Sequence, residues 1–245
     1  MKINKLALLF VAITALPAWA APDIHWSYEG SNAPEHWGEL SPEFQTCNKG
    51  QYQSPIDIHR VIDGKLPPLQ FNFHTDTKTI VNNGHTIQVT VKDSDDFSLD
   101  DDTFVLKQFH FHTPSENHLF GKAFPMEAHF VHTNKEGELA VLAVMFERGA
   151  ENKALDPIIA SIPASLDSVE VMKQSGDMAS LFPADKHYYR FSGSLTTPPC
   201  TEGVRWLIMK YPATLSDKQL KAFEHALKHS NNRPVQHLNG RIIVD

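Results

Sequence analysis

Two pairs of residues in this sequence have the types and spacing of metal ligands. His110 and His112 are separated by one residue in the segment Gln108-Phe109-His110-Phe111-His112, and Glu127 and His129 are spaced in the same way. In a β-strand, residues i and i+2 point to one face, so each pair would project its side chains together. Three neutral imidazoles with one open position form a catalytic zinc arrangement. His110, His112 and His129 are therefore candidate ligands.

An H-x-H pair is weak evidence when it stands alone. With 14 histidines among 245 residues, about one such pair is expected by chance. Ordinary strand histidines therefore remain an alternative for His129 and His132. The neighbouring residues favour a site, since Glu127 could accept the second N–H of His129 and Gln108 that of a nearby histidine. Hydrogen bonds of this kind orient metal ligands.

The surrounding pattern predicts the elements that must hold these side chains. Alternating or continuous apolar runs indicate strands, and Asn83-Gly84 predicts a turn. Ser216 and Gln219 form a capping-box pattern for a helix over Ser216–His229, and a shorter helix is expected near Asn152–Ser161, where Pro157 limits its start. The expected strands are His85–Val91, Phe104–His112, Glu127–His132, Leu139–Phe146 and Val204–Lys210. The fold class is therefore mainly β with peripheral helices, in one domain.

Composition excludes several other classes of protein. The chain is 41% hydrophobic and 21% charged, which excludes disordered, collagen-like and coiled-coil chains. Its formal net charge of −7 argues against a protein that binds nucleic acid through the phosphate backbone. We therefore expect a single globular domain and no nucleic-acid partner.

The first 20 residues have the pattern of a signal peptide. Lys2 and Lys5 precede the apolar run Leu6–Ala15, and Ala18-Trp19-Ala20 has the form of a cleavage site. A membrane anchor is the alternative, but the run is shorter than the roughly 20 apolar residues that span a bilayer. We expect residues 1–20 to be removed and residues 21–245 to form the domain, periplasmic or secreted, with no membrane association after cleavage.

Cys47 and Cys200 are the only cysteines in the sequence. In an exported protein an even pair indicates a disulfide, and two buried free thiols are the alternative. A bridge across this long loop could stabilise the fold by up to roughly 5 kcal/mol on the chain-entropy model.

A series of motifs, in order along the mature chain, resembles those of α-class carbonic anhydrases. The resemblance covers essentially all of residues 21–245, and eight or more ordered matches make it specific. The matching motifs are Trp26-Ser27-Tyr28, Pro34-Glu35-His36-Trp37, Gln53-Ser54-Pro55-Ile56-Asp57-Ile58, Asn83-Gly84-His85, Gln108-Phe109-His110-Phe111-His112, Ser115-Glu116, Glu127-Ala128-His129-Phe130-Val131-His132, Ser194-Leu195-Thr196-Thr197-Pro198-Pro199-Cys200 and Asn232-Arg233-Pro234.

The resemblance implies a zinc enzyme that reversibly hydrates carbon dioxide to bicarbonate and a proton by attack of zinc-bound hydroxide. His110, His112 and His129 would bind Zn²⁺, while Gln108 and Glu127 would accept hydrogen bonds from ligand rings. It also implies a large, mostly antiparallel twisted sheet of about ten strands. Cis peptide bonds are expected at Ser54-Pro55 and Pro198-Pro199.

The resemblance further implies roles for residues around the metal. Thr196 would accept the proton of the hydroxide and give its own hydroxyl hydrogen to Glu116. His85 would shuttle protons, Tyr28 would hold ordered water, and Thr197 would lie in the substrate pocket. An apolar wall for CO₂ would be formed by Val131, Val141, Leu195, Val204 and Trp206.

Some residues depart from the animal pattern, and other functions stay open. Thr113 stands where animal members have Trp, Asn117 stands where they have His, and the segment between His112 and Glu116 is shorter. These departures leave the support of Glu116 open. The alternatives to a carbonic anhydrase are a non-catalytic binding module on the same fold and a zinc esterase. The expected partner is the small-molecule substrate, in a monomer or homodimer.

Overall fold

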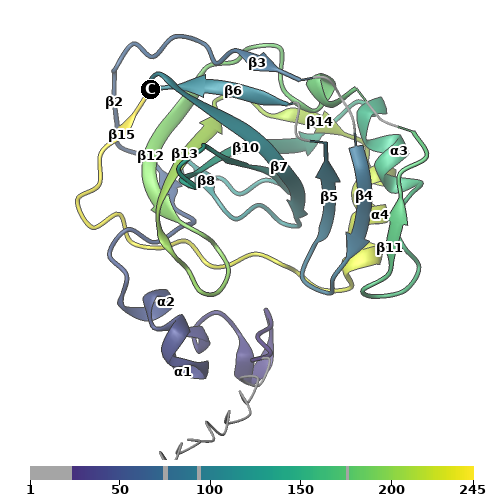
Figure 1. Ribbon diagram of the computed structural model, residues 1–245, viewed down its shortest axis with the longest axis horizontal. Helices are drawn as coiled ribbons and strands as arrows, with labels where there is room; N and C mark the ends of the chain where they lie inside the picture. Colours follow the sequence, from purple (N-terminus) through teal and green to yellow (C-terminus); the bar gives the residue numbers. More distant parts are fainter. Residues whose placement is uncertain (1–23, 74–76, 93–94, 175–176) are drawn as a thin grey trace, which may run out of the picture.

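One large mixed β-sheet runs through the molecule (Figure 1). The computed structural model describes residues 24–73, 77–92, 95–174 and 177–245, so the predicted signal peptide lies outside the described residues. In pairing order, the main path of the sheet is β11 (Val169–Val171), β4 (Thr77–Asn82), β5 (Ile87–Val91), β7 (Asp102–His112), β9 (Met126–Thr133), β10 (Leu139–Arg148), β13 (Glu202–Met209), β12 (Tyr188–Ser194), β15 (Ile243–Val244) and β2 (Val61–Ile62).

Three short strands extend the sheet off this path. β14 (Ala213–Leu215) pairs with β10, and β6 (Asp96–Leu99) pairs with β7 and with β3 (Phe71–Asn72). Most pairings among the described residues are antiparallel, and the parallel ones are β10 with β13, β10 with β14, and β15 with β2. β1 (Asp57–Ile58) and β8 (His118–Leu119) form a separate parallel pair. The predicted mainly β, mostly antiparallel sheet with about ten strands is confirmed.

The helices are short and lie at the periphery of the sheet (Figure 1). Figure 1 shows α1 (Trp37–Leu40) and α2 (Thr46–Lys49) beside the N-terminal segment, and α3 (Asp156–Ile159) and α4 (Asp217–Leu227) at the opposite side, near β4 and β11. No helix of the described segments is long and apolar enough to cross a membrane.

The capping box predicted for the longest helix is present at the start of α4. The Ser216 hydroxyl accepts a hydrogen bond from the Gln219 backbone N–H at 3.3 Å, and Gln219 Oε1 accepts from the Ser216 N–H at 3.1 Å. The helix ends at Leu227, because Lys228 adopts a left-handed conformation with φ 68°. The helix predicted near Asn152–Ser161 divides into a 3₁₀ turn over Lys153–Leu155 and α3.

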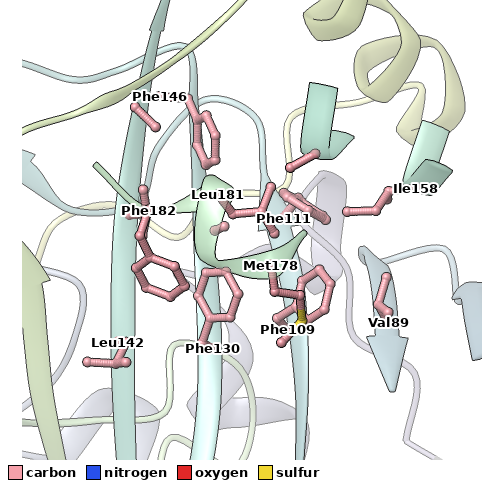
Figure 2. Packing of buried hydrophobic residues seen from close by; sticks show 14 of the residues in the cluster. Val89, Phe109, Phe111, Phe130, Leu142, Phe146, Ile158, Met178, Leu181 and Phe182 are labelled. Atoms are coloured by element: carbon pink, nitrogen blue, oxygen red, sulfur yellow. The ribbon is translucent and has the colours of Figure 1, made fainter. Parts of the chain in front are cut away.

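The central strands are buried on both faces. On one face, which we call the phenylalanine face, Phe109, Phe111 and Phe130 pack with β10 residues (Figure 2). The Phe111 ring also lies 4.7 Å from the ring of Phe223 on α4. On the other, the histidine face, β7 and β9 carry His110, His112 and His129, and a second apolar cluster lies on β10 and β13. The almost wholly apolar β10 sequence follows from this position between two clusters.

A β-bulge in β7 decides which residues of the strand reach each face. Before it, Phe104 and Leu106 are buried in the phenylalanine-face cluster; after it, Phe109 and Phe111 are. The register against β9 shifts between Leu106 and Gln108. One extra residue reverses the alternation of side chains. The bulge therefore lets an uninterrupted apolar cluster coexist with histidines at the end of the same strand.

Most predicted strand boundaries lie within two residues of the observed ones. β5 begins at Ile87 rather than His85, because the Asn83 side chain accepts hydrogen bonds from the His85 and Thr86 N–H groups and extends the turn. Gly84 in this turn has φ 79°, which favours glycine.

The disulfide and both implied cis peptide bonds are present. Cys47 and Cys200 are bonded, with Cα atoms 5.0 Å apart. Cis bonds precede Pro55 and Pro199, and a third, which was not expected, precedes Pro114. The bridge ties α2 to the segment that follows Thr196.

Candidate metal centre

Three imidazole rings converge at the end of β7 and on β9. His110 and His129 lie directly opposite each other in the pairing of the two strands, and His112 follows on the same face of β7. One ring nitrogen from each histidine lies within 4.8 Å of the others. The pairing of β7 with β9 thus brings together the two predicted pairs, His110 with His112 and Glu127 with His129, although they lie 17 residues apart in the sequence.

In each ring, the nitrogen that points away from the other two histidines lies close to an oxygen that can accept a hydrogen bond. Gln108 Oε1 lies 2.8 Å from His110 Nδ1, and the Asn231 backbone oxygen lies 2.7 Å from His112 Nδ1. Glu127 Oε1 lies 2.9 Å from His129 Nε2, at ion-pair distance but without full hydrogen-bond geometry. Acceptors at these atoms place the N–H outward and leave His110 Nε2, His112 Nε2 and His129 Nδ1 as inward lone pairs.

The donor set fits a zinc ion. Burial lowers the pKa of all three histidines, with the neighbouring imidazoles adding to the effect for His110 and His129. The rings are therefore neutral near pH 7, as ligation requires. His112 Nε2 is buried with no hydrogen-bond partner among the described residues. Three neutral nitrogens without a thiolate form the ligand set of catalytic zinc.

Glu116 is buried beside the candidate ligands. Its Oε2 lies 3.5 Å from His112 Nε2 and 3.8 Å from His129 Nδ1, and its Oε1 accepts a hydrogen bond from the Arg233 backbone N–H at 2.8 Å. Burial raises the pKa of Glu116 to about 8, against opposing effects of the Arg233 N–H and the Thr196 hydroxyl. Thr196, also buried, thus faces the carboxylate with which the resemblance pairs it.

The Glu127 carboxylate organises the loop that carries Glu116. It accepts hydrogen bonds from the Glu116 N–H at 2.7 Å and from the Asn117 N–H at 2.9 Å through one oxygen, and from Asn117 Nδ2 at 2.8 Å through the other. Asn117, which departs from the animal pattern, therefore bonds to the residue behind His129. The support of Glu116 that the sequence left open comes from this carboxylate and from Arg233.

Asn231 contributes to the centre and was missed by the sequence analysis. The Asn231 backbone oxygen accepts a hydrogen bond from His112 Nδ1, and the Asn231 side-chain Oδ1 accepts one from the Thr113 N–H at 2.8 Å. Its Nδ2 donates to the backbone oxygens of His85 and Phe111, each at 2.9 Å. A buried asparagine lacks a sequence signal, although the neighbouring Asn232-Arg233-Pro234 motif marks the segment.

The residues expected to form an apolar wall lie together on the histidine face. All five belong to or pack against one apolar cluster. The Trp206 ring meets His129 edge to face at 4.9 Å between centroids, so the cluster reaches the candidate ligands. Thr197 is half-buried in the loop after Leu195, where its carbonyl accepts from the Cys200 N–H. The wall residues are Val131, Val141, Leu195, Val204 and Trp206.

His85 and Tyr28 line a pocket of about 510 Å³, and the three candidate ligands are not among its described lining residues. His85 is half-buried, and its ring stacks on the Trp26 indole with 3.8 Å between the centroids. The indole covers one face of its ring. Burial and the negative charge of Glu116 raise the pKa of Tyr28 well above its ordinary value, so its hydroxyl stays protonated.

The chain is similar to carbonic anhydrases in sequence and in structure. Residues 32–245 match the family model described as eukaryotic-type carbonic anhydrase. Carbonic anhydrases from Pectobacterium carotovorum and Klebsiella pneumoniae are 48% and 47% identical, over 98% and 99% of this chain and 99% and 98% of theirs. The structure of an α-carbonic anhydrase from Thermovibrio ammonificans with the inhibitor sulfanilamide is 45% identical, with a TM-score of 0.89 over 91% of this chain and 99% of that one.

Proposed function

The chain belongs to the α-class carbonic anhydrase family and is an enzyme that reversibly hydrates carbon dioxide; we propose that it works with a zinc ion held by His110, His112 and His129. The observation that carries this proposal is the convergence of three ring nitrogens within 4.8 Å. When bound, zinc lowers the pKa of a water molecule to about 7, a known property of the family, and so supplies a nucleophile near neutral pH.

Thr196 and Glu116 orient the nucleophile. The Thr196 hydroxyl faces the Glu116 carboxylate, and when it donates its hydrogen there, its oxygen can only accept a second hydrogen bond. It therefore selects an O–H group and directs the oxygen lone pair to the opposite side, toward CO₂. This is a positioning effect. The Arg233 N–H and the Thr196 hydroxyl lower the pKa of Glu116 against the larger effect of burial, and so stabilise the ionised form that accepts both hydrogen bonds.

The apolar wall receives the substrate. Carbon dioxide has no net charge and accepts hydrogen bonds weakly, so an apolar surface beside the nucleophile is the appropriate receptor. Val141, Val204 and Trp206 supply a buried surface of this kind next to His129. Thr197 lies at the start of the adjoining loop and contacts the substrate from that side. Tyr28, held protonated by its burial, donates to ordered water.

His85 carries the released proton toward solvent. Each hydration cycle produces one proton, and histidine is the side chain whose ordinary pKa lies near neutral pH. His85 is not among the ligands, and its backbone oxygen and the His112 ring both bond to Asn231. This shared partner places the turn with His85 next to the metal centre.

The protein is exported, with residues 1–20 as its signal peptide and a periplasmic or secreted mature chain. The basic start, the apolar run and Ala18-Trp19-Ala20 support this, and the bond between Cys47 and Cys200 suits an oxidising compartment. Mass spectrometry of the mature protein tests it, and an N-terminus other than Ala21 would contradict it. Its oligomeric state, monomer or homodimer, stays a prediction.

The metal assignment is tested by zinc analysis combined with stopped-flow CO₂ hydration. We expect the purified protein to hold one zinc ion, to lose activity with a chelator, and to regain it on zinc addition. His129→Ala should lose most of its zinc and its activity, whereas the control His187→Ala, at an exposed ring, should keep both. Ester hydrolysis on the same samples separates a dedicated esterase. A fully active, zinc-loaded His129→Ala variant would contradict the ligand set.

A further inference from the structure

Arg233 is a buried arginine whose guanidinium is held, within the described part of the chain, by neutral acceptors. The residue is 2% exposed. Its Nη1 donates to Gln53 Oε1 at 2.9 Å and to the Ser54 carbonyl at 2.8 Å, and its Nη2 donates to the Cys47 carbonyl at 2.8 Å. Burial lowers the pKa of Arg233 to about 10, so the group stays charged near pH 7. A buried charge is costly unless it is hydrogen-bonded, and these three oxygens meet that need.

The segment that carries Arg233 has no secondary structure of its own. Residues 228–238 belong to no helix or strand. Two backbone groups of this segment nevertheless contact the metal centre, since the Asn231 carbonyl accepts from His112 Nδ1 and the Arg233 N–H donates to Glu116 Oε1. Because no strand pairing fixes these groups, the bonds made by the side chains of the segment must hold them in place.

The loop that carries Thr196 is tied at both ends to the residues that bind this guanidinium. Before Thr196, the Ser54 N–H donates to Ser194 Oγ at 2.9 Å and the Ser194 N–H donates to Ser54 Oγ at 3.1 Å. After Thr196, Gln53 Nε2 donates to the Cys200 carbonyl at 3.0 Å. A shift of Gln53 and Ser54 would therefore move both ends of the loop together.

Arg233 thus joins the two sides of the contact between Thr196 and Glu116. Its backbone N–H binds the carboxylate, and its guanidinium binds Gln53 and Ser54, which hold the threonine loop. We propose that Arg233 is a positioning residue for CO₂ hydration, whose side chain sets the alignment of Thr196 with Glu116. This inference rests on the proposed orienting role of those two residues, and Arg233 acts through them.

The geometry of the guanidinium, rather than its charge alone, is what this role requires. The group is a rigid planar fork, so its two Nη atoms donate in fixed directions to acceptors on separate segments. It also lies over the buried Trp37 ring, 5.7 Å from the ring centroid. Lysine carries the same charge on a single nitrogen, which cannot donate from both Nη positions. Arg233→Lys therefore removes the fork and keeps the charge.

Arg241 provides a matched control for a purely structural role. Its Nε, Nη1 and Nη2 donate to the carbonyls of Leu238, Ser192 and His237 at 3.0, 3.2 and 2.7 Å, and its guanidinium lies 6.0 Å from the Tyr52 ring centroid. Like Arg233, it binds backbone carbonyls and an aromatic ring. None of these partners is a candidate ligand or belongs to the contact between threonine and glutamate described above. Arg241→Lys should therefore affect stability alone.

The test compares kcat/KM for CO₂ hydration by zinc-loaded enzymes in stopped-flow experiments. This parameter covers the steps up to CO₂ conversion, so proton release does not affect it. Arg233→Lys should lower kcat/KM about tenfold, the effect of one misaligned hydrogen bond to a charged group, while its zinc content stays at the wild-type level. Arg241→Lys should keep wild-type kcat/KM, although chemical denaturation should show both variants to be less stable.

A double-mutant comparison separates positioning from a structural effect. In the Thr196→Ala background, Arg233→Lys should cause no further loss of kcat/KM, because the group that Arg233 aligns is gone. Gln53→Met is a second variant, which leaves Arg233 in place but removes one of its acceptors and the tie to Cys200. It should lower kcat/KM about threefold, as for one neutral hydrogen bond, and it carries the test if Arg233→Lys does not fold.

The outcomes that overturn the inference differ from those that overturn the orienting role of Thr196. If Thr196→Ala keeps wild-type kcat/KM, the orienting role itself is wrong. If Thr196→Ala is slow, but Arg233→Lys and Gln53→Met are as fast as Arg241→Lys, the inference is wrong and the orienting role stands. Equal losses from Arg233→Lys in both backgrounds, or a loss of activity that is matched by a loss of zinc, also contradict the inference.

Discussion

The phenylalanine face and the histidine face of β7 and β9 are built by the same two strands in different ways. On the first, Phe109 lies opposite Phe130 in the strand pairing, and their rings stack at 5.1 Å between centroids. On the second, His110 lies opposite His129 in the next pairing position. The apolar face needs only partners of suitable size, whereas each histidine needs an acceptor at one particular nitrogen.

This difference determines where the supporting residues come from. Packing on the phenylalanine face uses neighbouring strands and α4, with many interchangeable contacts. On the histidine face, Gln108 lies on the same strand as His110, Glu127 on the same strand as His129, and Asn231 more than 100 residues from His112. Damage to the first face should therefore reduce stability, and damage to the second should reduce function.

The largest expected effect on stability comes from Phe130→Ala on the phenylalanine face. Removing a fully buried phenylalanine side chain should lower the free energy of unfolding by about 3–5 kcal/mol, from lost burial and the cavity left behind. Folded molecules should keep their zinc and specific activity. Phe120→Ala, at a ring that is 63% exposed, is the control, with a change within about 0.5 kcal/mol. Chemical denaturation measures both, and equal losses would contradict the comparison.

The next effect concerns the disulfide, which supports the histidine face from outside the sheet. The carbonyl of Cys47 accepts from Arg233 Nη2, and the carbonyl of Cys200 accepts from Gln53 Nε2. Cys47→Ser combined with Cys200→Ser should cost about 2–4 kcal/mol of unfolding free energy, because the open loop of the unfolded chain gains entropy. Comparison with the wild type by denaturation checks this, and an unchanged midpoint would refute it.

Thr196→Ala should affect function without a comparable loss of stability. Zinc content should stay at wild-type level, while kcat/KM for CO₂ hydration should fall by about 100-fold, because a nucleophile without its orienting partner is misplaced. Thr103→Ala, at an exposed position of β7, is the matched control. Stopped-flow kinetics and zinc analysis test the pair, and a Thr196→Ala variant as fast as wild type would remove the orienting role.

His132 is a titratable side chain on the phenylalanine face and gives that face a pH dependence. It packs against Phe97 at 4.7 Å, and burial lowers its pKa from 6.5 to about 3, with only partial opposition from hydrogen bonds to the Phe130 and Ala140 backbone. Between these pH values the unfolded chain binds a proton that the folded protein does not. Stability is therefore lost as pH falls below about 6.5.

The size of this pH effect follows from how far the pH lies below 6.5, the ordinary pKa of histidine, and above about 3, the pKa of His132 in the folded protein. At pH 5, about 1.5 units below the ordinary pKa of histidine, wild type should have lost about 2 kcal/mol of unfolding free energy through His132. His132→Leu should show a shallower decline between pH 7 and pH 5, since all other histidines are unchanged. Denaturation at both pH values measures the two slopes, and parallel slopes would show that His132 does not contribute.

The two faces also differ in how far the sequence predicts them. The period-2 spacing of His110 with His112, and of Glu127 with His129, predicts that these side chains converge, because strand geometry alone brings each pair to one face. The bulge between Leu106 and Gln108 was not predicted, since no residue type marks it, and without the bulge Leu106 would share a face with His110. Residue spacing therefore predicts which side chains share a face at the C-terminal end of β7. It does not predict the position at which the alternation of side chains between the two faces reverses.

Longer-range features were less predictable for a physical reason. The role of Asn231 depends on which backbone oxygens lie near its amide, and that is decided by the packing of segments more than 100 residues apart. The stacking of Trp26 on His85, which leaves His85 half-buried, has the same origin. The disulfide could be predicted because there were only two cysteines to pair.

The most direct test of the account is the position of zinc in crystals of the purified protein, from anomalous diffraction at the zinc absorption edge. The account predicts one strong peak about 2.0–2.1 Å from His110 Nε2, His112 Nε2 and His129 Nδ1. Gln108, Asn231 and Glu127 should remain behind the three rings, as they are here. A peak at other residues, or ligation through His129 Nε2, would contradict the arrangement of the histidine face.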